Sequence, residues 1–254
     1  KADQSINRAE AIKMILTTTG LCPKNLETPP PENTEESPVE ALFADTPIDS
    51  WYYKYLSIAK EKGLISGYWD GNFYPESTIN LAETLKIYFE ALNNNYAGID
   101  LSGTTQTLFD DTPQDSWFSK YTSYAGEKGI INIYQTNTVS PNQEMTRGYL
   151  SEIIYRYIKS LEGYNFGKAT FYFGITGKNN DYYDQNMLTT AHKTLPKGTI
   201  VEVTNLTNGK SVKVKVTDRG PYGPGRVLDL SKIAFSQIAS VSTGIVSVQY
   251  KIVE

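Results

Sequence analysis

The sequence contains one cysteine, Cys22, and one histidine, His192, and this scarcity excludes several kinds of chemistry. A single cysteine cannot form an internal disulfide framework, and one histidine far from that cysteine gives no zinc-ligand spacing. The sequence also lacks an apolar run of about 18 residues that could span a bilayer, a secretory signal, a phosphate-binding glycine loop and a Ser-His-Asp pattern. We therefore expect no metal, no cofactor and no transmembrane segment, and we interpret the chain as a mature or trimmed piece.

Strong positive charge is also lacking. The 24 Lys and Arg residues are outnumbered by 28 Asp and Glu residues, which gives a formal net charge of −4. Because phosphate binding requires a basic surface, this balance argues against nucleic acid as a partner. A length of 254 residues allows one to three domains. Tyrosine is abundant, at 19 residues, and rings with a polar tip suit a sugar-facing surface as well as half-buried positions.

An internal repeat occupies residues 1–162. The segment FADTPIDSWYYKYLSIAKEKGLI, residues 43–65, superposes without a gap on FDDTPQDSWFSKYTSYAGEKGII, residues 109–131, at an offset of 66. A second segment follows in each copy, and a third version of it, INRAEAIKMIL, stands alone at residues 6–16. Because one such unit cannot bury its own apolar face, we expect the copies to pack on one another.

Each complete repeat is predicted to form two helices. A serine is suited to cap the first helix, a Lys-Gly pair to end it, and an Asn or Thr to begin the second helix. These positions are Ser50, Gly63 and Asn80 in one copy and Ser116, Gly129 and Thr146 in the other. The Pro-rich and acidic stretch 28–38 and the polar stretch 93–107 are predicted to be exposed connections.

The repeats resemble the S-layer homology family, which has an F-x-D motif near a Trp, a loop of the type GYWDGNFYP and a second helix that opens with T-R-A-E. The resemblance implies a three-repeat helical bundle that holds a bacterial surface protein on anionic secondary cell-wall polysaccharide. The residues that it assigns to polysaccharide binding are Arg8, Arg147, Trp51, Trp117 and Asp70. A guanidinium at a helix start suits an anion. The chain departs from the family at Leu81, which replaces the arginine, and at residues 133–137, which replace the loop.

The C-terminal part is predicted to be rich in strands. Valines alternate at residues 201–203 and 212–216, and Asn208-Gly209 between these runs predicts a hairpin with a type I′ turn. Gly220-Pro221 is expected to end the second strand. Residues 231–239 predict a short helix, and alternation over residues 246–252 predicts a closing strand.

Four ordered segments of this part resemble the rare lipoprotein A (RlpA)-like double-psi β-barrel. They are GKATFYFG, LTTAHKTLPKGTIVEVTN, VKVTDRGPYGPGRVLDLS and VSVQYKIVE. The family includes lytic transglycosylases that cut peptidoglycan glycan strands, and its barrel is shared with expansins. The resemblance implies that Asp218, Asp229 and His192 are the catalytic residues.

The chemistry of the two aspartates leaves alternatives open. A lytic transglycosylase can work with one acid, because a hydroxyl of the sugar itself closes onto the anomeric carbon. We prefer Asp218 as this acid, with its pKa raised by burial or by the charge of Asp229, and with His192 positioning it. The structural alternatives are that Asp229 caps the following helix and that Asp218 forms a turn or an ion pair with Arg219 or Arg226.

Further residues are assigned to substrate binding on the same resemblance: Thr170, Tyr172, Asp181, Arg219, Tyr222 and Arg226. Alternation does not decide whether Thr170 and Tyr172 or the phenylalanines beside them face the groove. The family commonly carries T-A-N-G-E before the histidine, and Asp181 in Gly-Lys-Asn-Asn-Asp stands in for that glutamate with a shorter reach.

The sequence therefore predicts a multidomain protein, an all-α three-repeat bundle joined to an all-β six-stranded barrel. The expected domains are a partial repeat at residues 1–27, repeats at 40–95 and 106–162, and the barrel at 165–254. We expect an exported protein of the cell surface or cell wall that acts on peptidoglycan glycan strands. The alternative is a non-catalytic, expansin-like module that binds carbohydrate or loosens the wall, and a third reading is a surface scaffold that binds another protein.

Overall fold

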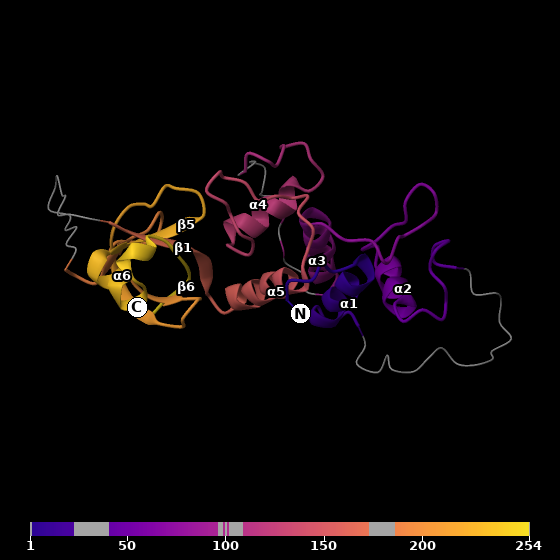
Figure 1. Ribbon diagram of the computed structural model, residues 1–254, viewed down its shortest axis with the longest axis horizontal. Coiled ribbons are helices and arrows are strands. Elements are labelled where there is room, and N and C mark those ends of the chain that lie inside the picture. The colour runs from indigo at the N-terminus through magenta and orange to yellow at the C-terminus, as the bar shows by residue number, and fades with distance from the viewer. Residues whose placement is uncertain are drawn as a thin grey trace. The chain divides into compact units, whose positions relative to one another are not determined.

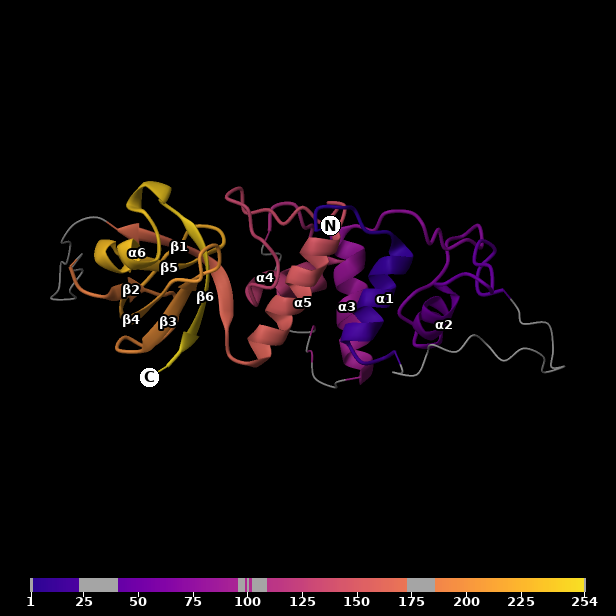
Figure 2. The ribbon, with the colours of Figure 1, turned by 60° about the horizontal axis from the view of Figure 1, so that its bottom comes forward.

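The computed structural model describes residues 2–22, 41–95, 99, 101, 109–172 and 186–253, and Figures 1 and 2 label most of its elements. The predicted connection at residues 28–38, most of that at 93–107, and Asp181 lie outside these ranges. The chain divides into two compact units, which are considered separately. The first comprises Lys1–Thr107, Thr112–Tyr124 and Ser140–Ile154, and the second comprises Leu108–Asp111, Ala125–Val139 and Tyr155–Glu254.

Five helices precede the strands in the described residues. They are α1 (Arg8–Thr18), α2 (Tyr53–Glu61), α3 (Leu81–Asn95), α4 (Ser119–Glu127) and α5 (Arg147–Leu161). Both α1 and α3 begin with a capping box, because the Asn7 and Asn80 side chains accept from Glu10 N and Glu83 N while each glutamate reaches back. Figure 2 shows α1, α3 and the first half of α5 side by side.

The first turns of α1, α3 and α5 are linked by a cyclic set of backbone hydrogen bonds within the first unit. The amide of Arg8 donates to Ser77 O, that of Leu81 to Gln143 O, and that of Arg147 to Gln4 O. The bridges Asn7↔Thr78, Asn80↔Glu144 and Ser5↔Thr146 follow the same order. Each copy of the repeated segment therefore satisfies the free amides at the start of a helix in another copy.

The predicted helix ends are only partly correct. Gly63 and Gly129 do adopt left-handed conformations, with φ of 69° and 67°, just after α2 and α4. The capping serines are wrong: the N-cap of α2 is Tyr52, without a side-chain cap, and Ser50 and Ser116 donate instead to the carbonyl oxygens of prolines three residues before them. A turn follows each serine, in which Tyr53 N donates to Ser50 O and Ser119 N donates to Ser116 O, so each helix begins three residues after the serine.

The second unit contains a closed barrel with strand order β1-β5-β2-β4-β3-β6. The strands are β1 (Asn165–Tyr172), β2 (Thr189–Ala191), β3 (Ile200–Asn205), β4 (Ser211–Asp218), β5 (Arg226–Ser231) and β6 (Val246–Ile252). Helix α6 (Lys232–Ile238) and the 3-10 helix η1 (Val241–Thr243) follow β5. The expected six-stranded closed barrel is thus confirmed.

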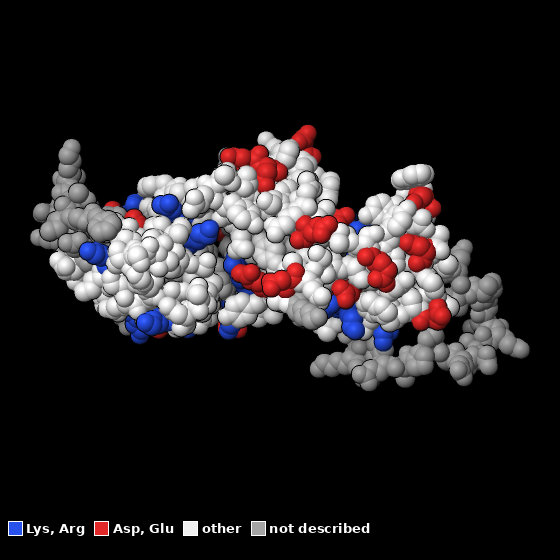
Figure 3. Space-filling view, in the orientation of Figure 1, with Lys and Arg blue, Asp and Glu red and all other residues white. Residues whose placement is uncertain are grey.

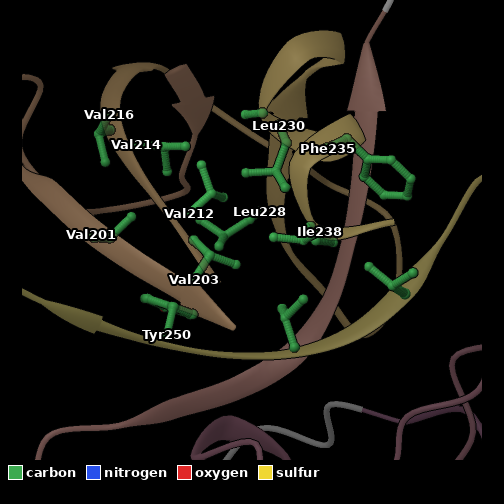
Figure 4. Close-up of a cluster of buried hydrophobic side chains, with 14 residues drawn as sticks. Val201, Val203, Val212, Val214, Val216, Leu228, Leu230, Phe235, Ile238 and Tyr250 are labelled. Atoms are coloured by element: carbon green, nitrogen blue, oxygen red, sulfur yellow. The ribbon is translucent and has the colours of Figure 1, made fainter. Parts of the chain in front are cut away.

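Alternate residues of the strands fill the barrel core (Figure 4). The predicted valines of β3 and β4 all belong to it, together with leucines of β5 and with Phe235 and Ile238 of α6. Phe171 packs against Phe235 with ring centroids 4.8 Å apart, so Phe171 faces the core side of β1. Because successive side chains of a strand alternate, Thr170 and Tyr172 lie on the outer face.

The predicted type I′ turn is wrong. Among the described residues of the β3–β4 loop, Gly209 has a positive φ, 71°, and Asn208 does not. The last paired residues are Thr204 and Ser211, so the loop is longer than two residues. Its conformation is fixed by Asn208, whose side chain donates to Ile238 O at 2.9 Å. The hairpin itself, which Asn-Gly also predicted, is present.

The segment 125–139 packs on the start of β1 within the second unit. A side chain at Gly129 would meet the backbone oxygen of Phe166 at 2.4 Å. The guanidinium of Arg156, on α5, donates to Gly129 O at 3.2 Å and to the Asn132 side chain at 2.9 Å. A glycine is therefore required at position 129 by close packing as well as by its φ.

Helices in the described ranges are all too short or too polar to cross a bilayer.

Candidate functional site

Four residues form a row across the outer face of neighbouring strands. Asp218 at the end of β4 pairs with Ala191 of β2, Ala191 pairs with Asp229 of β5, and Asp229 pairs with Thr170 of β1. Paired residues direct their side chains to the same face. Neighbouring strands lie about 4.8 Å apart, so the two aspartate backbones are roughly 10 Å apart.

A bulge brings Asp218 into this row. Val216 pairs with Thr190 and lies in the core, and the register shifts before Asp218 pairs with Ala191. Thr217 is therefore the extra residue. In a regular strand Asp218, two positions after Val216, would share the inward face of Val216. The strand ends there, as the sequence predicted, before Gly220 and Pro221.

Asp229 is half-buried between Leu228 and Leu230, which point into the core. Burial raises the pKa of its carboxyl group, although the hydrogen bond from Thr170 and the charge of Arg226 act in the opposite direction. The Thr170 hydroxyl donates to Asp229 Oδ1 at 2.7 Å. Burial, rather than the charge of a second aspartate, therefore favours the protonated form.

Two structural alternatives for the aspartates are wrong. Ser231, and not Asp229, caps α6, because its hydroxyl accepts from Ala234 N. Arg219 directs its guanidinium to Leu195 O, at 2.9 Å. In the described residues, no ion pair joins the Asp218 carboxylate to an arginine.

His192 is buried, and its ring bonds to Tyr250 of β6 and to the loop that follows β2. Its Nδ1 accepts from the amides of Thr194 and Leu195, at 3.1 and 2.9 Å. Since Nδ1 accepts, the proton of the neutral ring is on Nε2, which lies 2.8 Å from the Tyr250 hydroxyl. Burial, followed by the charges of Arg219 and Lys193, lowers the pKa of His192.

The imidazole of His192 therefore contacts neither candidate carboxylate in the described part of the chain. The link to Asp218 is between main-chain atoms: His192 N donates to the backbone carbonyl oxygen of Asp218 at 3.1 Å. The ring fixes the loop after β2, and the backbone joins this loop to the end of β4. The side chain thus positions the Asp218 segment through the backbone.

The residues assigned to substrate binding lie on two sides of this row. Tyr172 is buried, with its hydroxyl 2.8 Å from that of Thr189. Tyr222 is 80% exposed, and Arg226 pairs with Lys168 at the start of the β1–β5 ladder. A hollow of about 850 Å³ within the second unit is lined by His192, Tyr222 and Arg226, but by neither Asp218 nor Asp229.

Lys168 is a residue of this surface that was not singled out from the sequence. It lies two positions before Thr170 on β1 and lines the same hollow as Arg226. The available signal was the alternation Lys168, Thr170, Tyr172, which puts these three side chains on one face.

The wall-binding residues assigned from the repeats separate into two groups. Trp51 and Arg147 line one groove of about 470 Å³ in the first unit, together with Lys13, which was not anticipated. Lys13 Nζ lies 5.4 Å from the centroid of the Trp51 ring, and Arg147 forms an ion pair with Glu10 at 2.7 Å.

Arg8 is not in this groove. It is 7% exposed, donates to Phe73 O at 3.1 Å and pairs with Glu83 at 3.3 Å, and its guanidinium lies 4.5 Å from the centroid of the Phe73 ring. These contacts hold α1 against the loop before α3 rather than presenting a charge to solvent.

The two remaining residues also lie outside the groove. Trp117 is 54% exposed. Asp70 accepts from Asn72 N at 3.0 Å and from the Tyr74 hydroxyl, and these hydrogen bonds lower its pKa. Asp70 therefore shapes the loop in which it lies.

Family models match two separate parts of the chain. Residues 165–250 match the family described as lytic transglycolase. Residues 42–85 and 108–148 match the S-layer homology domain.

Curated relatives are similar to part of the chain. The endolytic peptidoglycan transglycosylase RlpA of Campylobacter jejuni is 47% identical over 91 residues, which cover 34% of this chain and 33% of that protein. The RlpA proteins of Vibrio cholerae and Pasteurella multocida are 42% and 33% identical over 104 and 136 residues. These matches cover 39% and 51% of this chain and 40% and 45% of the relatives. The chain thus spans less than half the length of the curated relatives it matches.

Solved structures with some similarity include a papain inhibitor of Streptomyces, at 27% identity and a TM-score of 0.31, covering 36% of this chain and 94% of that one. An expansin of Clavibacter michiganensis is 26% identical, with a TM-score of 0.31 and coverage of 36% and 50%. From the family matches and the closed barrel, the chain carries S-layer homology repeats followed by an RlpA-like lytic transglycolase domain of the double-psi β-barrel type.

Proposed function

We propose that the barrel cleaves peptidoglycan glycan strands by lytic transglycosylation, with Asp229 as the general acid. Asp229 protonates the glycosidic oxygen that leaves C1 of the muramoyl residue. The C6 hydroxyl of the same sugar forms a new bond to C1 as the old bond breaks, and its proton passes to the carboxylate. Because no water is consumed, one carboxyl group acts first as acid and then as base.

The observation that supports Asp229 is its half-buried position on the outer face, with Thr170 bonded to one carboxyl oxygen. Burial raises its pKa, as a general acid requires. Thr170 fixes the orientation of the carboxyl group, which leaves the second oxygen for a ligand. The sequence favoured Asp218, but this geometry favours Asp229 and leaves Asp218 at the far edge of the row, where it can bind sugar hydroxyls.

The test is cleavage of peptide-free glycan strands, with mass spectrometry of 1,6-anhydro-muramoyl ends. We expect products from the natural chain and from Asp218→Asn at a reduced rate, and none above background from Asp229→Asn. Anhydro ends that persist with Asp229→Asn would remove Asp229 as the acid. The absence of products from the natural chain would remove the enzymatic function.

A second candidate function is an expansin-like module that binds glycan without cutting it. It is favoured by the orientation of His192, which bonds to neither carboxylate. A glycan-binding chain that yields no anhydro ends, and that binds equally well after Asp229→Asn, would support this candidate.

The helical part is proposed to hold the protein on anionic secondary cell-wall polysaccharide, at the cell surface or in the wall. The groove of Trp51, Lys13 and Arg147 supports this, since a ring and two cations suit an anionic sugar. The cyclic links among α1, α3 and α5 support a three-repeat bundle. The site would then be shared between copies, with Lys13 from α1 and Arg147 from α5.

Sedimentation with purified walls, with and without their anionic polysaccharide, tests the anchor. We expect binding only to the intact walls, and a loss of that binding with Lys13→Gln and Arg147→Gln together. Equal binding to both wall preparations would remove these two residues from the proposal.

A further inference from the structure

The hollow in the second unit is basic. Its lining includes Lys168, Lys193 and Arg226, which form no ion pair within the described ranges. Among the described residues that line the hollow, the acidic one is Glu127, whose side chain is exposed. Cations without a partner carboxylate on the wall of a cavity are available to an anionic ligand.

Two of these cations lie on the same outer face as the proposed acid. Lys168 pairs with Arg226 on the β1–β5 ladder, and after a bulge Thr170 pairs with Asp229 on the same two strands. Asp229 lies three positions after Arg226 on β5, which is roughly 10 Å of backbone. The charge of Arg226 also acts on the Asp229 carboxyl group. A chain-like ligand can therefore lie along β1 and β5, with one end in the hollow and its middle at Asp229.

The hollow also offers a flat apolar surface. Tyr222 lines it and is 80% exposed, so its ring is open to stacking with the face of a sugar. Within the second unit, the far wall comes from residues 126–137, and Ile133 O lies 2.9 Å from where a Cβ at Gly225 would stand. Residues 133–137 replace the loop that is typical of S-layer homology repeats. Ile133 in this segment packs against Gly225 of the second unit.

We propose that this hollow binds the lactyl carboxylate of a muramoyl residue, so that Lys168 and Arg226 set the position of the glycan relative to Asp229. In a peptide-free strand this carboxylate is free on every second sugar. The inference takes peptidoglycan glycan as the ligand from the proposed function. It concerns how this glycan is recognised and not how it is cleaved. It predicts that the protein distinguishes muramoyl-containing glycan from chitin, which has the same linkage and acetamido groups but no carboxylate.

The test compares the affinities of two oligomers of equal length, peptide-free glycan and chito-oligosaccharide, by calorimetry. The full chain is used with Asp229→Asn to prevent turnover. We expect at least tenfold tighter binding of the peptide-free glycan. We expect Lys168→Gln with Arg226→Gln to abolish this preference by weakening the binding of the peptide-free glycan more than that of chito-oligosaccharide.

The matched control is Lys213→Gln with Lys215→Gln, which removes the same charge from exposed positions of β4 outside the hollow. Equal affinity for the two oligomers, or an equal loss of preference in the control pair, would overturn the proposal. Thermal unfolding of each variant checks that the barrel is intact, and Arg226→Lys, which keeps the charge, should recover part of the preference. Cleavage is measured separately, so an inactive protein that still prefers the muramoyl oligomer would refute the enzymatic function alone.

Discussion

The cations of the helical part and of the barrel are used differently. Residues 1–162 contain 13 Lys and Arg and 22 Asp and Glu, a formal charge of −9, whereas residues 163–254 contain 11 and 6, a charge of +5. Figure 3 shows red side chains gathered over the helical part and blue ones over the barrel on the face in view. The small net charge of the whole chain conceals this difference.

The difference affects what each cation can bind. In the helical part both Arg8 and Arg147 pair with glutamates, so an anionic ligand must compete with an existing partner. On the barrel, Lys168 and Arg226 have no such partner in the described residues. A basic residue type at a family position therefore does not by itself identify an anion site, and its partners must be known.

The largest effect is expected at the carboxyl group of the barrel. Asp229→Asn should lower the rate of glycan cleavage by at least about 100-fold, because a general acid contributes roughly 10²–10⁴. The variant should also be slightly more stable near neutral pH, since a buried charge is removed. Because the pKa of Asp229 is raised in the folded state, its carboxyl group favours folding at low pH. This contribution to the free energy of unfolding is lost as pH rises through the folded-state pKa. Activity and thermal unfolding, measured on the same sample, check both expectations.

The sequence predicted the barrel better than its site. The strands could be predicted from the alternating valines, from Gly220-Pro221 and from the alternation over residues 246–252. This was possible because burial with a period of two depends only on neighbouring residues in the sequence. The row of Asp218, Ala191 and Asp229 was not predictable, because it depends on which strands are neighbours and on an extra residue at Thr217. The orientation of His192 depends on Tyr250, 58 positions away.

In the helical part, the second helices followed from their Asn and Thr caps, and the repeat offset predicted equivalent contacts. The two family arginines could not be distinguished from sequence. Arg8 is buried because Glu83 and Phe73 come together from another copy, whereas Arg147 is exposed beside Glu10.

Arg8→Ala is therefore expected to destabilise the helical part by about 2–4 kcal/mol, because it leaves Glu83 without its partner and removes a packed side chain. Arg8→Lys should lie between the natural chain and Arg8→Ala, because it keeps the charge and loses the donor to Phe73 O. Chemical denaturation followed by circular dichroism measures the change. If Arg8→Ala is as stable as the natural chain but no longer binds walls, Arg8 contacts the polysaccharide and does not serve the fold.

Tyr250→Phe tests the corresponding buried contact of the barrel. It removes the hydroxyl beside His192 Nε2 with little change in shape, and an unsatisfied buried donor costs roughly 1–3 kcal/mol. Burial raises the pKa of Tyr250 to about 12, so the hydroxyl is neutral throughout the working range. We expect a lower free energy of unfolding at pH 7 and largely retained cleavage. Loss of cleavage without loss of stability would show that His192 acts on the substrate.

The pH dependence of stability follows from the same contact. The pKa of His192 is lower in the folded state than its usual value, so its contribution is complete above about pH 6.5 and is lost as pH falls through the folded-state pKa. Asp229 acts in the opposite direction, because its pKa is raised. The loss on acidification should therefore be steeper in Asp229→Asn than in the natural chain, as measured by denaturation at pH 7.5 and at pH 4, where the window extends down to the ordinary pKa of an aspartate. An equal or shallower loss would contradict this assignment.

The smallest effect on stability is expected at Arg147. Its ion pair with Glu10 is largely exposed, and such pairs contribute about 0–1 kcal/mol, so Arg147→Gln should leave the unfolding midpoint almost unchanged. Binding to walls should nevertheless fall, and the residual binding should depend less on salt, because one cation fewer faces the anionic polymer. Glu10→Gln is the matched variant: releasing Arg147 from its partner should strengthen binding. If Glu10→Gln weakens binding as much as Arg147→Gln does, the pair serves the shape of the groove and the cation is not a contact for the polysaccharide.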